Sequence, residues 1–324
     1  MVAGPAVLVV GGGLTAASAV RSLRRVLPAE RILVWEASAS LGGRFCTDEL
    51  ALPSGASAVA DTGAQYVTST DAADGPLYAE LRDAGVLMPL AGRIRGSRAA
   101  DGGGENFVAP RGLSSIVSHM FGACGVAPTC SRRAVGLRRG ARGGWDVHAE
   151  TGEATRADGV ILTPPVPHTL ALIDSGEARK WLDATPARAA LDSIEYSKRY
   201  ALALAWPADT RPLFSASADY VSRYVDPDED DAIVYVAIDS ARRADHVGPV
   251  SLTVHSSVPY GLRMMGGGAD DAAVQADLLG RLNKLLPWLP PPAASTLRRW
   301  PISQVRFPLP DSLLPSGPCL PLVP

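Results

Sequence analysis

Six residues near the N-terminus have the types and spacing of a phosphate-binding loop. The sequence GGGLTA at residues 11–16 follows a short apolar run and precedes a stretch with helical spacing. In such a loop Gly11 permits a tight turn, Gly13 lets a pyrophosphate approach the backbone, and Ala16 lets the helix pack closely on the sheet. The helix N-terminus supplies unpaired N–H groups and a partial positive charge for the phosphates. The pattern therefore indicates a dinucleotide site.

An acid and a second glycine pair make this indication more specific. Glu36 ends the second predicted strand, where its carboxylate can accept hydrogen bonds from the adenosine ribose and would repel a 2′-phosphate. Residues 42–44, Gly-Gly-Arg, follow six to eight positions later, and such an element is typical of FAD-binding proteins of the glutathione-reductase and amine-oxidase type. Arg44 can neutralise phosphate or hydrogen-bond the middle of the cofactor. A lone glycine run would be a simple turn, but this context predicts FAD and places Gly43 and Arg44 beside it.

The elements that must position this loop are short and apolar. Residues 6–10 and 31–35 are predicted as buried strands, and residues 15–26 have the spacing of a helix. Together they form one βαβ unit. A further buried strand is predicted at residues 160–163, before two prolines.

The rest of the chain predicts a second kind of architecture. Apolar alternation at residues 200–206, 231–238 and 250–258 indicates a mostly antiparallel sheet, and residues 272–286 form an amphipathic helix with an apolar stripe. A helix at 113–121 and a hairpin from 134–137 and 145–149 are also predicted, whereas 65–104 is polar and glycine-rich. These elements predict an α/β fold that combines a Rossmann-like βαβ unit with a mostly antiparallel sheet.

Composition excludes several classes of protein. The 324 residues carry a formal net charge of −2, so we expect neither nucleic acid nor membrane as a partner and predict a monomer. No stretch is long and apolar enough to span a bilayer, and no positive segment precedes Arg21 as in a signal peptide. No nucleophile motif is present, and the histidines lack metal-ligand spacing, so no metal is predicted. The four cysteines form no CxxC pair.

Beyond these motifs, the chain resembles the renalase family segment by segment, in the family's order from Val7 to Val305. The runs that carry this resemblance are DTGAQYV at 61–67, NFVAPRGLSSI at 106–116, YSKRYAL at 196–202, VHSSVPYG at 254–261 and RWPISQV at 299–305.

The resemblance implies an activity and its contacts. Renalases oxidise the 2- and 6-dihydro isomers of NAD(P)H to NAD(P)⁺ and reduce O2 to hydrogen peroxide. The fold class that it implies is α/β: a Rossmann-like FAD-binding domain, discontinuous at 1–80, 106–167 and 270–305, with an inserted α+β substrate domain at 81–105 and 168–269 built on a mostly antiparallel sheet. It also implies FAD contacts from Thr15, Arg44, Gln65, Tyr66 and Val135. The family also implies a secreted protein, although the absence of a cleavable signal leaves a cytoplasmic location open.

Two residues are candidates to act over the flavin ring. His255 lies in the middle of a predicted strand of the substrate sheet, and Tyr66 follows Gln65 in the segment expected to reach the ring. For His255 a hydrogen-bonded core position and a substrate-facing position both stay open, because period-two alternation does not say which face meets the cofactor. Trp300 is either part of the core or an aromatic wall, and Arg111 is either a phosphate contact or a solvated side chain.

The C-terminal residues 306–324 differ from the family. Members end with a strand, a Gly-Asp turn and a helix that complete the flavin site, whereas this segment carries prolines throughout and is expected to be extended or disordered. Two alternatives to a renalase-type oxidase are therefore considered. One is a catalytically inactive, C-terminally altered variant that acts as an interaction protein. The other is an FAD monooxygenase, against which the renalase-like runs argue.

Overall fold

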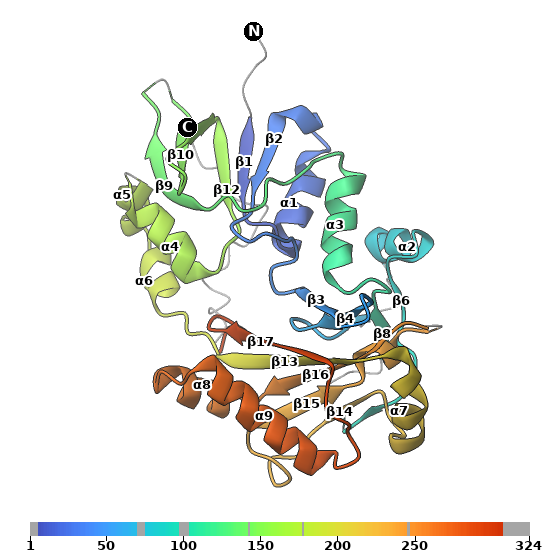
Figure 1. The fold of residues 1–324 in the computed structure, drawn as a ribbon. Helices are drawn as coiled ribbons and strands as arrows, with labels where there is room; N and C mark the ends of the chain where they lie inside the picture. Colours follow the sequence, from blue (N-terminus) through green and yellow to red (C-terminus); the bar gives the residue numbers. More distant parts are fainter. Residues whose placement is uncertain are drawn as a thin grey trace. The chain divides into compact units, whose positions relative to one another are not determined.

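The computed structural model describes residues 6–69, 75–96, 104–141, 143–176, 178–244 and 247–306. The chain forms two compact units, and each is discontinuous in sequence (Figure 1). The first comprises Met1–Ser40, Ala123–Ser197 and Ile302–Pro324, and the second comprises Leu41–Gly122 and Lys198–Pro301. The units are described in turn.

The first unit is built on a parallel three-stranded sheet in the order β12-β1-β2. Its elements are β1 (Val7–Val10), α1 (Leu14–Leu23), β2 (Ile32–Trp35) and β12 (Gly159–Leu162). The sequence forms these elements because β1 and β2 are apolar runs, and because α1 buries Ala16, Ala17 and Val20. The predicted βαβ unit and the strand at 160–163 are confirmed.

An antiparallel sheet, β11-β10-β9, also belongs to the first unit. The predicted hairpin is confirmed, because β9 (Ala134–Arg139) pairs with β10 (Trp145–Ala149); the third strand, β11 (Ala154–Ala157), was not predicted. Leu137 and Val147 pack in one apolar cluster with Leu8 of β1, to which the following helices add Leu172 and Ala178. Those helices are α4 (Val166–Asp174), α5 (Ala178–Asp183) and α6 (Ala187–Asp192).

The second unit is built on a six-stranded sheet in the order β17-β13-β16-β15-β14-β7. Its strands are β7 (Ile94–Arg95), β13 (Arg199–Trp206), β14 (Ser222–Tyr224), β15 (Ile233–Ala237), β16 (Val250–Ser256) and β17 (Ala294–Trp300). All neighbours are antiparallel except β14 and β7, so the predicted antiparallel sheet is confirmed.

One predicted strand boundary is wrong. The run at 250–258 was predicted to be extended throughout, but the strand ends at Ser256, and α8 (Val258–Gly266) begins with Ser257 as its N-cap. The Ser257 side chain accepts a hydrogen bond from the Tyr260 N–H, and Pro259 in the first turn suits a helix start. Capping chemistry therefore outweighs the apolar alternation.

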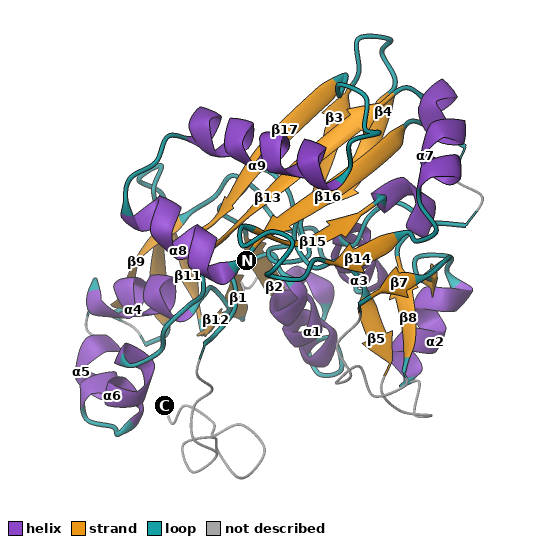
Figure 2. Ribbon diagram, turned by 90° about the horizontal axis from the view of Figure 1, so that it is seen from below, coloured by secondary structure: helices purple, strands orange, loops and turns teal. Residues whose placement is uncertain are grey.

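The two faces of this sheet differ. One face is covered by α8 and α9 (Asp271–Leu285) (Figures 1 and 2). On this face Leu202, Leu204 and Val254 of the sheet belong to a large apolar cluster. Helix α9 contributes the fully buried side chains of Val274, Leu278 and Leu282 to the same cluster. On the opposite face, Ala203 and Ala205 pack against a hairpin of β3 (Thr47–Ala51) and β4 (Ser57–Asp61). The predicted amphipathic helix at 272–286 is confirmed as α9.

The polar segment at 65–104 contributes structure to the second unit. A small sheet, β5-β8-β6, is formed by β5 (Val67–Ser69), β6 (Met88–Pro89) and β8 (Glu105–Val108). The remaining helices of this part are α2 (Pro76–Asp83), α3 (Ser114–Ala123) and α7 (Arg211–Ser217). Helix α3 confirms the helix predicted at 113–121.

The compact units do not coincide with the predicted domains. Residues 41–80, 106–122 and 270–301, predicted within the FAD-binding domain, belong to the unit that holds the six-stranded sheet, and residues 168–197, predicted within the substrate domain, belong to the other unit. Since compactness does not identify which residues bind cofactor, the functional division stays a prediction. The proline-rich tail beyond Arg306 lies outside the described residues. Across the described ranges, every helix falls short of the length and apolar character needed to cross a membrane.

Candidate functional site

The glycine loop in the first unit is held closely against the parallel sheet. Gly11 has φ of +112°, a conformation that favours glycine, and its N–H donates to Trp35 O at 2.7 Å. A Cβ atom at Gly11 would overlap the hydroxyl oxygen of Thr163, which itself donates to Val10 O at 2.8 Å. Glycine is therefore required at this position by the fold itself.

Gly13 has a different role. It is the N-cap of α1 with φ of −94°, an ordinary conformation for any residue. Glycine has no side chain that could accept hydrogen bonds from the first N–H groups of α1, and the first turn of the helix contains no acidic residue. This arrangement suits an anion such as a pyrophosphate.

Glu36 is anchored to the same loop. Its two carboxylate oxygens accept the N–H groups of Gly12 at 2.5 Å and Ser38 at 2.7 Å. The backbone of Glu36 is also held: its N–H donates to Thr129 O at 2.9 Å, and its carbonyl oxygen accepts from Arg132 N at 2.8 Å. Each carboxylate oxygen retains a further lone pair, so a ribose hydroxyl can still be accepted here. The acid thus organises the loop in addition to its predicted role toward ribose.

The other predicted cofactor contacts of the first unit vary in exposure. Thr15 is exposed in the first turn of α1, Ala16 is fully buried, and Val135 on β9 is 45% exposed. Burial of Ala16 agrees with close packing of α1 on the sheet. Contact of Thr15 and Val135 with a cofactor stays a prediction.

The Gly-Gly-Arg element lies in the second unit, in contact with the chain just before Gln65. Gly42 and Gly43 have φ of +127° and +56°, and Phe45 N donates to Gly42 O at 2.9 Å in the turn that they form. Ala64 N donates to Arg44 O at 2.8 Å, and a Cβ atom at Gly63 would overlap that same oxygen. Gly63 is thus needed for a close backbone approach that the sequence reading missed.

Gln65 and His255, predicted separately, are brought together. Gln65 Nε2 lies 2.7 Å from Nε2 of His255, although the residues are 190 positions apart. His255 is partly buried, and burial, followed by the charges of Arg199 and Arg242, lowers its pKa to about 3. The imidazole is therefore neutral at physiological pH.

His255 belongs to a row of side chains that crosses the sheet. It is paired with Ala201 on one side and Tyr235 on the other, and Tyr235 is paired with Tyr224. Directly paired residues point to the same face of a sheet. The centroid of the Tyr235 ring lies 6.2 Å from that of the His255 ring, in an edge-on arrangement, and 5.0 Å from that of the Tyr224 ring.

Tyr66 extends this row. Its hydroxyl lies 2.8 Å from the hydroxyl of Tyr224. The two predicted catalytic candidates, His255 and Tyr66, are thereby linked through an aromatic surface made with Tyr224 and Tyr235, neither of which was predicted.

The register settles which face His255 occupies. Val254 packs into the helix-covered cluster, and alternation sends His255 to the opposite face. His255 therefore does not belong to the apolar core covered by α8 and α9, but it is hydrogen-bonded and partly buried on the other face, so the core position and the substrate contact both stay predictions. Trp300 lies on this face too, since its partner Arg199 is two residues from Ala201, and its indole N–H donates to Thr62 O at 2.8 Å. Arg111 is exposed.

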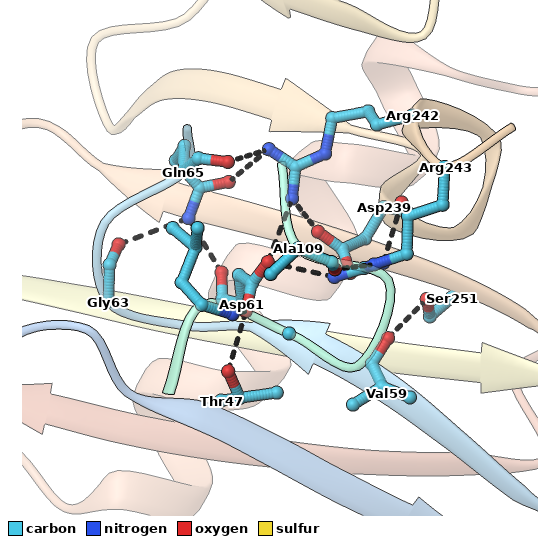
Figure 3. Close-up of polar contacts among 12 residues, drawn as sticks. Thr47, Val59, Asp61, Gly63, Gln65, Ala109, Asp239, Arg242, Arg243 and Ser251 are labelled. Atoms are coloured by element: carbon cyan, nitrogen blue, oxygen red, sulfur yellow. Dashed lines mark hydrogen bonds and ion pairs between the residues drawn. The ribbon is translucent and has the colours of Figure 1, made fainter. Parts of the chain in front are cut away.

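Beside Gln65 lies a buried ionic cluster, which we define as Asp61, Asp239, Arg242 and Arg243 (Figure 3). Arg243 Nη2 donates to Asp61 Oδ2 at 2.8 Å and its Nη1 to Asp239 Oδ2 at 2.5 Å. Arg242 forms an ion pair with Asp239 and donates from Nη1 to the backbone oxygen of Gln65. The sequence did not predict this cluster, although the two adjacent arginines at 242–243, three and four residues after Asp239, could have indicated it.

Three comparisons place the chain among known proteins. Residues 9–81 match the model of the NAD(P)-binding Rossmann-like domain. Renalase from Mus musculus is 33% identical over 306 residues, which cover 92% of this chain and 85% of the mouse protein.

Solved structures show the same fold at low identity. A putative protoporphyrinogen oxidase from Exiguobacterium sp. 255-15 has a TM-score of 0.68 at 13% identity, covering 95% of this chain and 88% of that chain. A redesigned putrescine oxidase has a TM-score of 0.58 at 13% identity, covering 86% and 81% respectively. The predicted fold class is thereby confirmed.

Proposed function

The chain belongs to the renalase family, and we propose from this that it oxidises the 2- and 6-dihydro isomers of NAD(P)H to NAD(P)⁺ and reduces O2 to hydrogen peroxide. In coarser terms it is a flavin-dependent oxidoreductase of renalase type, and FAD is the cofactor that the family and the fold point to. The observation that carries the proposal is 33% identity to a renalase across 92% of the chain, with an intact dinucleotide loop.

The residues present fit the adenosine diphosphate half of FAD. Gly13 leaves the N-terminus of α1 without a side-chain cap, which supports binding of the pyrophosphate there. Glu36, held by Gly12 and Ser38, supports recognition of the ribose. When bound, FAD accepts a hydride from the substrate and passes the two electrons to oxygen.

The second unit offers residues suited to a dihydronicotinamide. The rings of Tyr224 and Tyr66, both partly exposed and backed by buried Tyr235, favour a flat heterocycle, and neutral His255 adds no charge against the cationic product. Hydride transfer demands orientation and exclusion of water more than acid or base catalysis. We propose that this surface orients the substrate ring, while Arg44 and Gln65 contact the cofactor.

Comparison of three substrate isomers tests the proposal. The purified chain, supplied with FAD and air, should consume the 2- and 6-dihydro isomers and release one hydrogen peroxide for each NAD(P)⁺ formed, because two electrons leave each substrate molecule and reduce one O2. The ordinary 4-dihydro form should be consumed far more slowly. Equal turnover of all three isomers, or formation of a hydroxylated product at the expense of ordinary NADPH, would contradict the proposal.

A further inference from the structure

The side-chain amide of Gln65 has one possible orientation. Its Nε2 lies 2.6 Å from Asp61 O and 3.1 Å from Gly63 O, and carbonyl oxygens only accept hydrogen bonds. On its other side, Arg242 donates from Nη1 to the backbone oxygen of Gln65 and approaches Oε1 at 3.4 Å (Figure 3). A flipped amide would set oxygen against two carbonyls and N–H against a guanidinium, so Nε2 must be the nitrogen that faces His255.

This orientation determines where the His255 proton sits. The Gln65 NH2 group carries two hydrogens, and its two shortest contacts are Asp61 O at 2.6 Å and His255 Nε2 at 2.7 Å. An imidazole nitrogen that accepts a hydrogen bond carries no proton. A neutral imidazole has one proton, which must then be on Nδ1.

The opposite ring nitrogen is available to a ligand. Within the described residues, Nδ1 of His255 makes no hydrogen bond, and the residue is partly exposed on a strand that sends it to the face opposite α8 and α9. Arg199, the other cation near this ring, donates to Ser256 O at 2.9 Å.

We propose that Arg242 and Gln65 are positioning residues that fix His255 as an Nδ1–H donor, and that this N–H recognises the carboxamide oxygen of the dihydronicotinamide. The inference rests on the proposed function for the identity of the acceptor. The position of the proton follows from contacts within the protein alone, and it can be tested without turnover.

Nuclear magnetic resonance of ¹⁵N-histidine-labelled protein, at neutral pH and in the presence of FAD, tests the first step. The His255 signals are assigned by their loss in His255→Gln. We expect the wild-type ring to carry its proton on Nδ1, and Gln65→Glu to move it to Nε2, because a carboxylate accepts where the amide donated. The matched control is Gln275→Glu, the same change at a glutamine bonded to Ser295 on the protein surface, which should leave the tautomer unchanged.

Wild-type protein protonated on Nε2 would overturn the inference, as would an unchanged tautomer in a folded Gln65→Glu variant. Neither result depends on activity. An inactive chain with the Nδ1 tautomer would contradict the proposed function and leave the positioning role supported.

Two substitutions of His255 test the second step. Asparagine can place an N–H donor near the position of Nδ1, whereas glutamine places its donor near the position of Nε2. His255→Asn should keep KM for 2-dihydro-NAD within about threefold, and His255→Gln should raise it about tenfold, the size expected for loss of one hydrogen bond. The reverse order of KM values would overturn the assignment of Nδ1 as the donor.

Discussion

Arg243 donates from Nη2 to Asp61 Oδ2 at 2.8 Å, and neither side chain is more than slightly accessible to solvent. The two residues are 182 positions apart, so this contact joins β4 to the segment that follows β15. Asp61 also accepts Thr47 Oγ1 at 2.7 Å and Leu113 N at 2.8 Å. One carboxylate therefore connects several segments of the second unit.

We expect Asp61→Asn to destabilise the protein by about 3–5 kcal/mol, because it leaves the two buried guanidiniums of Arg242 and Arg243 with a single carboxylate, that of Asp239. Urea unfolding of the purified variant measures the change. Asp219→Asn is the control, since Asp219 pairs with Arg93 at 3.9 Å with both side chains about 70% exposed, and it should cost less than about 0.5 kcal/mol. Similar small changes in both variants would show that the buried ionic cluster contributes little.

The two glycines of the loop should respond differently to substitution. Gly11→Ala should lower the stability of the protein even without cofactor, because the added carbon overlaps Thr163 and the backbone has positive φ. Gly13→Val should preserve the fold, since its φ is −94°, and abolish FAD binding by filling the space the pyrophosphate needs. Thermal unfolding without cofactor and titration with FAD separate the two effects. Normal FAD affinity in Gly13→Val would show that this loop does not bind the cofactor.

Glu36→Ala should weaken FAD binding by about 10- to 100-fold, the range for losing hydrogen bonds to a charged acceptor. The loss is smaller than for Gly13→Val because the helix N-terminus remains. Equilibrium titration followed by flavin fluorescence measures it. An affinity unchanged by Glu36→Ala would remove the acid from the cofactor site and leave it only its bonds to Gly12 and Ser38.

The pKa of His255 predicts a pH-dependent stability. The folded protein keeps this ring neutral down to about pH 3, whereas the unfolded chain binds a proton near the ordinary value of 6.5. The unfolded state therefore binds more protons than the folded state below pH 6.5. The contribution of neutral His255 to the free energy of unfolding is complete above that pH and is lost as the pH falls toward 3. At pH 5 the loss is at most about 2 kcal/mol.

Unfolding of wild-type and His255→Asn protein at pH 8 and pH 5 isolates this contribution, because other groups titrate equally in both. The wild type should lose more stability than the variant on acidification. Identical pH dependence in wild type and His255→Asn would mean that the ring is not held neutral by its surroundings.

Much of the fold could be predicted because its signals are local. The β1-α1-β2 unit, β13 and α9 each contain a complete apolar period, and glycine or proline marks their ends. Strand β17 was missed because it is an edge strand with the polar sequence STLRR at 295–299. Strands β3 and β4 were missed because their apolar contacts, such as Leu50 with Ala203, join distant parts of the chain.

The site was predicted in part for the same reason. The loop at 11–16 and Glu36 are close in sequence and belong to one βαβ motif, which places them together, although the hydrogen bond from Gly12 N to Glu36 was not predicted. The contact of Gln65 with His255 depends on how β16 pairs with β13 and β15, and no local pattern contains that register. The family resemblance named Gln65 and the predicted strand named His255, but only the structure brings them together.

The measurement that tests the central claim most directly is the visible spectrum of the purified 324-residue chain, before and after anaerobic addition of a 2-dihydro isomer of NAD. A renalase-type oxidase should show bound oxidised flavin that bleaches on addition and recovers when oxygen is admitted, with hydrogen peroxide released. A folded, colourless protein that does not take up added FAD would contradict the account and favour an inactive variant that acts as an interaction protein.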